Sequence, residues 1–140
     1  MANVGDTLDS KSISVTQDLI NEYAHICGDY NTLHVDVEGM KDHPLFGGTI
    51  AHGTINVEPV LQALCAIQKT TWPLEGTMIN LQFRAPVKPG DTIASKLTVK
   101  DTKTEGGKTV LVCDLAIAND KGTDCVKGNG EIPLRCLEPY

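Results

Sequence analysis

Residues 54–71 constrain the fold most strongly, because they have the pattern of a helix with almost no polar face. The apolar residues of this segment fall on nearly every side of such a helix: Ile55, Val57, Val60, Leu61, Ala63, Leu64, Cys65, Ala66 and Ile67. A helix that is apolar nearly all round is typically buried on all sides. Pro59 lies in its early part, so we expect the helix to start near Glu58 or to be kinked there.

The rest of the chain after this helix has the pattern of β-structure. Apolar and polar residues alternate in four segments, which are 77–87, 92–100, 109–118 and 125–134. Period-two alternation is typical of strands with one buried face, and the short turns rich in glycine between the later segments predict an antiparallel meander. An antiparallel sheet that wraps one long helix satisfies both patterns, so we expect a single α+β domain over residues 1–140.

The N-terminal part contains a short strand that ends at Val15 and an amphipathic helix over 17–27. Thr16 is expected to cap this helix, and Gly28 is expected to end it. Residues 29–53 have no long periodic segment and predict an irregular connection. Long connections inside small domains are usually functional or mobile, so this region is the first place to search for chemistry.

The charge pattern argues against several classes of partner. The chain has 140 residues, a formal net charge of −6 and no block of lysine or arginine, so nucleic acid and anionic membranes are poor partners. An anionic small molecule remains compatible, since a local pair of basic residues would suffice. The N-terminus lacks the apolar run of a signal peptide, and no stretch approaches the length of a transmembrane helix. We therefore expect a soluble cytoplasmic protein.

The five cysteines are odd in number, widely spaced and without a C-x-x-C pair. They are Cys27, Cys65, Cys113, Cys125 and Cys136. Reduced core thiols explain this pattern better than disulfides or a zinc site.

Candidate chemistry begins in the stretch HICGDYNTLHVD, residues 25–36, where Asp29, Asn31 and His34 lie within six residues. A turn alone explains Asp29 and Asn31, because both side chains bond readily to local backbone. It does not require His34. Three neighbouring polar residues have ordinary interpretations: His25 as solvated, His43 as part of a loop, and Asp36 as a helix cap.

A second cluster, FGGTIAHGT at 46–54, ends where the buried helix is expected to enter. Backbone N–H groups at a helix N-terminus are unpaired and can polarise an oxygen, and Gly53 would let a ligand approach the backbone closely. Water addition to a conjugated thioester needs such a polarising group, a base for the water and an acid for the α-carbon. Asp29 and His34 could share the acid and base work.

Three stretches together resemble one family. GDYNTLHVD at 28–36, FGGTIAHG at 46–53 and FRAPVKPGDT at 83–92 are similar to motifs of the MaoC-like, or hydratase 2, family of (R)-specific enoyl-CoA hydratases. The resemblance implies a hot-dog fold, usually at least a homodimer with joined sheets. It also implies that Asp29 and His34 activate and deliver one water, that Asn31 orients them, and that the Gly53 N–H polarises the thioester carbonyl. One departure is Thr32, where the family usually has proline.

Further contacts with an acyl-CoA substrate are expected from His52, Thr54 and Arg84. His52 is equally compatible with anchoring the helix entrance, and Arg84 with a solvent-facing position. Asp29, His34, Asp36 and His52 could be drawn as metal ligands. No histidine pair at i, i+4 and no H-E-x-x-H supports them, so we expect neither a metal nor another cofactor beyond the coenzyme A thioester that is the substrate. The glycines at 47–48 match no phosphate-loop pattern.

The leading hypothesis is therefore an (R)-specific enoyl-CoA hydratase, equivalently a 3-hydroxyacyl-CoA dehydratase. Three alternatives remain open: a 3-hydroxyacyl-carrier-protein dehydratase, a hot-dog acyl-CoA thioesterase, and a non-catalytic acyl-binding module. Nothing in the sequence requires a simple fatty acyl chain as substrate.

Overall fold

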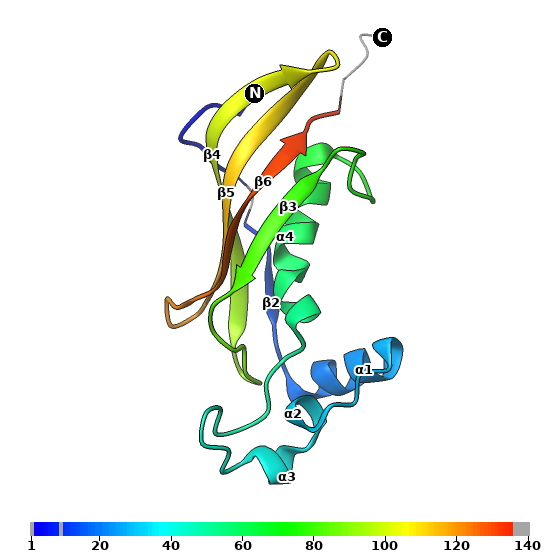
Figure 1. Cartoon of the computed structure of the whole chain (residues 1–140), viewed down its shortest axis with the longest axis vertical. Coiled ribbons are helices and arrows are strands. Elements are labelled where there is room, and N and C mark those ends of the chain that lie inside the picture. Colours follow the sequence, from blue (N-terminus) through cyan, green and yellow to red (C-terminus); the bar gives the residue numbers. More distant parts are fainter. Residues whose placement is uncertain (1, 9, 136–140) are drawn as a thin grey trace.

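The computed structural model describes residues 2–8 and 10–135, and it consists of an antiparallel sheet with one long helix packed against it (Figure 1). In chain order the elements are β1 (Thr7–Leu8), β2 (Ser12–Ser14), α1 (Gln17–Cys27), α2 (Thr32–Val35), α3 (Val37–Met40), α4 (Gly53–Gln68), β3 (Met78–Phe83), β4 (Thr92–Glu105), β5 (Lys108–Asn119) and β6 (Asp124–Pro133). Among these residues, no helix is both long and apolar enough to cross a bilayer.

The sheet has the strand order β1-β4-β5-β6-β3, with β2 also paired to β4. All of these pairs are antiparallel, and β4, β5 and β6 form the expected meander. Strand β3 joins the sheet beside β6, so it skips past the two strands that follow it in the chain and lies at an edge. The side chains of Ile93, Leu97, Val99, Leu115 and Ile117 face the core, as the period-two alternation predicts.

Helix α4 begins at Gly53, the entrance expected from the second polar cluster, which excludes the later start near Glu58 that Pro59 had left open. Pro59 lies inside the helix, which leaves the carbonyl of Ile55 without its usual N–H donor. The expectation of burial on all sides was wrong for this chain. The sheet covers one face of α4, where Val60, Ala63 and Leu64 are buried, whereas Glu58 and Gln62 on the opposite face are exposed.

Helix α1 has the predicted ends. The Thr16 Oγ1 accepts a hydrogen bond from the Leu19 N–H at 3.1 Å, and Gly28 ends the helix in a left-handed conformation with φ of 77°. The connection that follows is less irregular than expected, because it contains the short helices α2 and α3. Figure 1 shows that α1, α2 and α3 lie together at the end of the molecule where α4 begins.

The four cysteines in the described part of the chain are free thiols. Cys113 and Cys125 are buried, and burial raises the pKa of the Cys113 thiol to about 11. Cys65 is half-buried, but Cys27 is exposed at the end of α1, so its assignment to the core was wrong. Cys136 lies outside the described residues.

Gly128 in β6 provides a test of the sheet's packing. A Cβ atom at this position would overlap the backbone carbonyl oxygen of Asn80 in β3, and backbone atoms inside a sheet cannot move aside cheaply. We expect Gly128→Ala to lower the free energy of unfolding by about 2 kcal/mol or more, measured by denaturant titration. Lys127→Ala, at the exposed neighbouring position, is the control and should change it by less than about 1 kcal/mol. An equally stable Gly128→Ala protein would contradict this β3–β6 packing.

Candidate active site

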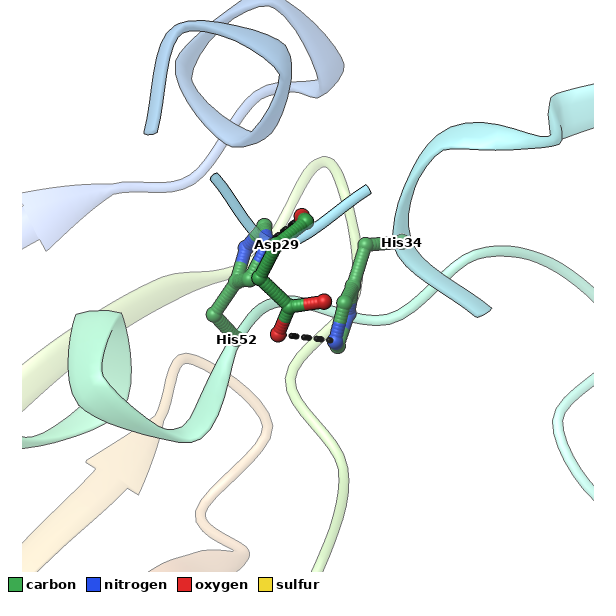
Figure 2. Close-up of side chains that lie close together, drawn as sticks. All are labelled: Asp29, His34 and His52. Atoms are coloured by element: carbon green, nitrogen blue, oxygen red, sulfur yellow. Dashed lines mark hydrogen bonds and ion pairs between the residues drawn. The ribbon is translucent and has the colours of Figure 1, made fainter. Parts of the chain in front are cut away.

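The two polar clusters of the sequence meet at the N-terminus of α4. Figure 2 shows Asp29, which follows α1, beside His34 from α2 and His52, which directly precedes α4. The Asp29 Oδ2 lies 3.7 Å from the His34 Nε2. The rings of His34 and His52 stack with their centroids 3.9 Å apart. Residues separated by more than twenty positions therefore form one polar group.

The turn after Gly28 fixes the position of Asp29. Its Oδ1 accepts a hydrogen bond from the Asn31 N–H at 3.1 Å, while its Oδ2 faces His34. The Asn31 Oδ1 in turn accepts from the Leu33 N–H at 3.0 Å and caps α2. Asn31 thus orders the segment that carries both Asp29 and His34, although its side chain is not among the groups that meet at His52.

His34 is held in one tautomer by its backbone partner. Its Nδ1 lies 2.8 Å from the carbonyl oxygen of Ile50, and because a carbonyl only accepts, Nδ1 must carry the proton. In the neutral ring the Nε2 therefore has a free lone pair, which faces the carboxylate of Asp29. Two hydrogen-bond acceptors meet at this point, and a water molecule can donate one hydrogen to each.

His52 holds the backbone of the site together. It is 3% exposed, and its Nε2 donates to the backbone carbonyl oxygen of Asp29 at 3.0 Å. Its ring packs between His34 and the ring of Tyr23, whose hydroxyl is hydrogen-bonded to the Thr54 hydroxyl. The His52 Nδ1 is buried and has no partner within the described residues. These contacts give His52 a positioning role toward Asp29.

The first backbone N–H groups of α4 are available to a ligand. The His52 side chain does not cap the helix, and the N–H groups of Gly53 and Thr54 make no hydrogen bond within the described residues. A helix N-terminus carries partial positive charge and favours an oxygen that gains negative charge. A Cβ at position 53 would lie 3.2 Å from a ring carbon of Phe83, so glycine keeps this approach open.

A cavity of about 340 Å³ lies beside Gly53. Its lining includes His34, Gly53, Asn56, Phe83 and Arg84. Arg84 is exposed, and its Nη2 donates to the Gln82 Oε1 at 3.0 Å. Thr54 does not line the cavity, and its part in substrate binding stays a prediction. Sequence reasoning missed Asn56, whose only sequence signal is an amide among the apolar residues of the buried helix.

The two other histidines lie apart from this group. The His25 Nδ1 is 2.8 Å from the hydroxyl of Tyr30, and both residues are exposed. The His43 Nδ1 accepts hydrogen bonds from the N–H groups of Leu45 and Phe46, as expected for a loop residue. Asp36 caps α3 by accepting from the Gly39 N–H at 2.9 Å, which confirms its interpretation as a helix cap.

The fit of the site to a metal ion is poor despite its composition. One ligand atom each from Asp29, His34 and His52 lies within 4.8 Å of the other two. However, imidazole lone pairs lie in the ring planes, and the two rings are stacked with only 25° between those planes. Their lone pairs therefore run side by side instead of converging on one ion as tetrahedral coordination requires. Water is the better occupant.

Comparison with known proteins places this chain in a family. The MaoC like domain matches residues 1–119. The (R)-hydratase from A. caviae involved in PHA biosynthesis superposes with a TM-score of 0.77 at 20% identity, over 96% of this chain and 98% of that one. This similarity shows the hot-dog fold, as the sequence motifs predicted.

Two curated relatives are each 30% identical over 101 residues, which is 70% of this chain. They are 3-hydroxyacyl-thioester dehydratase Z of Mycobacterium tuberculosis and 3-hydroxybutyryl-CoA dehydratase of Methylorubrum extorquens. The matched region spans 66% and 61% of their lengths, respectively, so this chain covers less than two thirds of each. The chain belongs to the MaoC-like domain family.

The tautomers of the stacked histidines can be measured directly by long-range ¹H–¹⁵N correlation spectra. The contacts to Ile50 and Asp29 require the proton on Nδ1 of His34 but on Nε2 of His52. His25→Gln and His43→Gln variants would assist assignment. An Nε2-protonated His34 would contradict the arrangement, because its lone pair would then not face Asp29.

Proposed function

We propose that this chain is a hydro-lyase that adds water to, or removes it from, the double bond of a 2-enoyl thioester. The observation that carries the proposal is the approach of two hydrogen-bond acceptors, Asp29 Oδ2 and His34 Nε2, beside the uncapped N-terminus of α4. The carbonyl of a thioester fits the N–H of Gly53, which places the conjugated carbons near Asp29 and His34. A base and a polarising donor then act on opposite ends of one conjugated system.

In the hydration direction, a water molecule about 2.8 Å from each acceptor donates one hydrogen to Asp29 and one to His34. Polarisation of the thioester carbonyl by Gly53 makes C3 electrophilic. The water oxygen bonds to C3, one of its protons passes to the Asp29–His34 pair, and the C2=C3 electron pair moves toward the carbonyl. A proton from the same pair then bonds to C2. Dehydration is the reverse, and no redox change or cofactor is required.

The names of the relatives support dehydratase chemistry, and the substrate of this chain must be identified by experiment. Their names describe dehydratases of a 3-hydroxyacyl thioester and of 3-hydroxybutyryl-CoA. We extend this to a coenzyme A substrate and an (R)-configured product, with Arg84 at the cavity as a contact for the anionic handle. A carrier-protein thioester would undergo the same chemistry. A cytoplasmic location remains an expectation from the sequence.

The catalytic pair is tested by Asp29→Asn and His34→Ala. Asp29→Asn replaces the basic carboxylate by a neutral amide, and His34→Ala removes the imidazole, so we expect each to lower kcat/KM by about 10²- to 10⁴-fold on the enoyl-CoA that the wild type converts fastest. The loss of enoyl absorbance measures the rate, and chiral analysis identifies the product. His25→Ala is the matched control, because this exposed histidine lies outside the site.

Near-wild-type rates in both Asp29→Asn and His34→Ala would exclude the proposed pair. Release of free thiol from an acyl-CoA, with no loss of the double bond, would instead identify a thioesterase. Tight binding of a saturated acyl-CoA with no turnover of any enoyl-CoA would identify a binding module.

We also propose that the protein is a homodimer. Strand β3 lies at a sheet edge and exposes Met78 and Phe83, while Val57 and Leu61 on α4 are only half-buried. Pairing of two such edges would satisfy unpaired backbone groups and cover apolar side chains. Sedimentation equilibrium should give a mass of about 30 kDa, twice the 15.0 kDa of one chain. A 15.0 kDa species at micromolar concentration would contradict the dimer.

A further inference from the structure

A second cavity, of about 460 Å³, lies next to the one at the proposed active site. Three stretches of chain, residues 34–41, 48–53 and 84–88, have one end in the lining of the active-site cavity and the other end in the lining of the second cavity. The ends at the active site are His34, Gly53 and Arg84, and the ends at the second cavity are Lys41, Gly48 and Lys88. Because all three stretches run from one lining to the other within a few residues, the two cavities are neighbours.

Two lysine side chains of the second cavity have no carboxylate partner. Lys41 and Lys88 are exposed, and neither forms an ion pair within residues 2–8 and 10–135. The turn that carries Lys88 is fixed, since the Lys88 N–H donates to the Asp91 Oδ2 at 2.9 Å. Glu38 is the one carboxylate in the lining, so the lining carries more positive than negative charge, in a chain whose net charge is −6. Such a local excess of positive charge favours an anionic ligand.

The same lining includes a glycine turn with free backbone donors. The N–H groups of Gly48 and Thr49 make no hydrogen bond within the described part of the chain. Gly47 has a φ of 59°, a left-handed conformation that favours glycine. A Cβ atom at Gly47 or Gly48 would meet nothing within 4 Å beyond the adjacent residues, so this part of the wall is open. Free N–H groups in a turn beside lysine side chains are donors that suit phosphate oxygens.

We propose that the second cavity binds the phosphate that ends a phosphopantetheine arm, with Lys41 and Lys88 as its counter-charges. This inference rests on the proposed function, since it takes the carbonyl of the thioester to lie at Gly53. Of the two halves of such a thioester, the thiol half is the one that carries phosphate. The excess positive charge therefore assigns the thiol half, and not the acyl half, to the second cavity.

The length of the arm agrees with this assignment. Between its sulfur and its phosphorus, a phosphopantetheine arm has about as many bonds as four residues of backbone, which is the separation of Arg84 from Lys88 in the chain. An arm of this length reaches from one cavity to the next. Coenzyme A carries further phosphates beyond this one, and they remain for other contacts, including the one proposed for Arg84.

The test compares but-2-enoyl thioesters of pantetheine, which has no phosphate, of 4′-phosphopantetheine and of coenzyme A. We expect the wild-type KM for the phosphopantetheine ester to be about 10-fold below that for the pantetheine ester, with a similar kcat, because the phosphate lies far from the reacting carbons. Lys41→Ala and Lys88→Ala should each raise the KM for the phosphorylated esters about 3-fold, and the double variant about 10-fold. The KM for the pantetheine ester should not change. Higher ionic strength should weaken binding of the phosphorylated esters alone.

Lys108→Ala is the matched control. Lys108 is an exposed lysine that forms no ion pair among the described residues, and it lies in the hairpin between β4 and β5, at the end of the molecule opposite α1, α2 and α3 (Figure 1). Its replacement should leave the KM of every ester unchanged. Calorimetric titration with free 4′-phosphopantetheine and with pantetheine supplies a readout that does not depend on turnover. The wild type should bind the phosphorylated compound about 10-fold more tightly, and the double variant should bind both equally.

The phosphate has two possible sources, because coenzyme A and a carrier protein both present a phosphopantetheine arm. A but-2-enoyl ester on a carrier protein is therefore assayed beside the coenzyme A ester. A rise in KM for either ester in the double variant supports the phosphate site, and the ester with the lower wild-type KM identifies the source.

The outcomes separate the inference from the function on which it rests. If the wild type converts none of the esters, the proposed function fails, and the calorimetric comparison alone decides whether the phosphate site exists. If the pantetheine and phosphopantetheine esters have equal KM values that the double variant does not change, the function stands and the inference is overturned. An equal rise in KM for the pantetheine ester in the double variant would also overturn it. So would a preference for a carboxylated enoyl group on pantetheine that depends on the two lysines, because the acyl half would then lie in the second cavity.

Discussion

The site depends on two hydrogen bonds that run in opposite directions between segments far apart in the chain. The His52 Nε2–H donates to the carbonyl of Asp29, and the His34 Nδ1–H donates to the carbonyl of Ile50. Together they join the turn after α1 to the segment that enters α4. Gln17 adds a further link, since it donates to the His34 carbonyl and accepts from the Thr49 hydroxyl. The orientation of the Asp29 carboxylate toward His34 follows from these contacts.

The same contacts explain why the entrance of α4 is open to a ligand. A residue at the N-cap position usually satisfies a free backbone N–H with its side chain. His52 occupies that position, with its Nε2–H donated to Asp29 and its Nδ1, the ring atom that could accept, buried without a partner, so it gives the helix no side-chain cap. The positive end of α4 therefore faces the cavity beside Asp29 and His34. A small loss in helix capping leaves a polarising group available at the site.

Sequence patterns predicted the parts of the structure that local interactions decide. Thr16 and Gly28 set the ends of α1 through contacts within a few residues, and the alternation around Leu97 set the buried face of the meander. The effect of Pro59 on α4 stayed open in the sequence because its signal is local, whereas burial against the sheet keeps the helix continuous through it. Sequence patterns could not single out His52 and Asn56 as buried polar residues, because their burial depends on which face of α4 the sheet covers.

The alternatives of a structural turn and a catalytic turn are not in conflict. Asp29 uses Oδ1 to hold the turn and Oδ2 to face His34, so the structural role and the proposed catalytic role use different oxygens. Thr32 begins α2, a position at which proline is favoured because its backbone is already fixed. Here the side chains of Asp29 and Asn31 supply hydrogen bonds on either side of that position. Stiffness that a proline ring would provide comes instead from the same residues that carry the proposed chemistry.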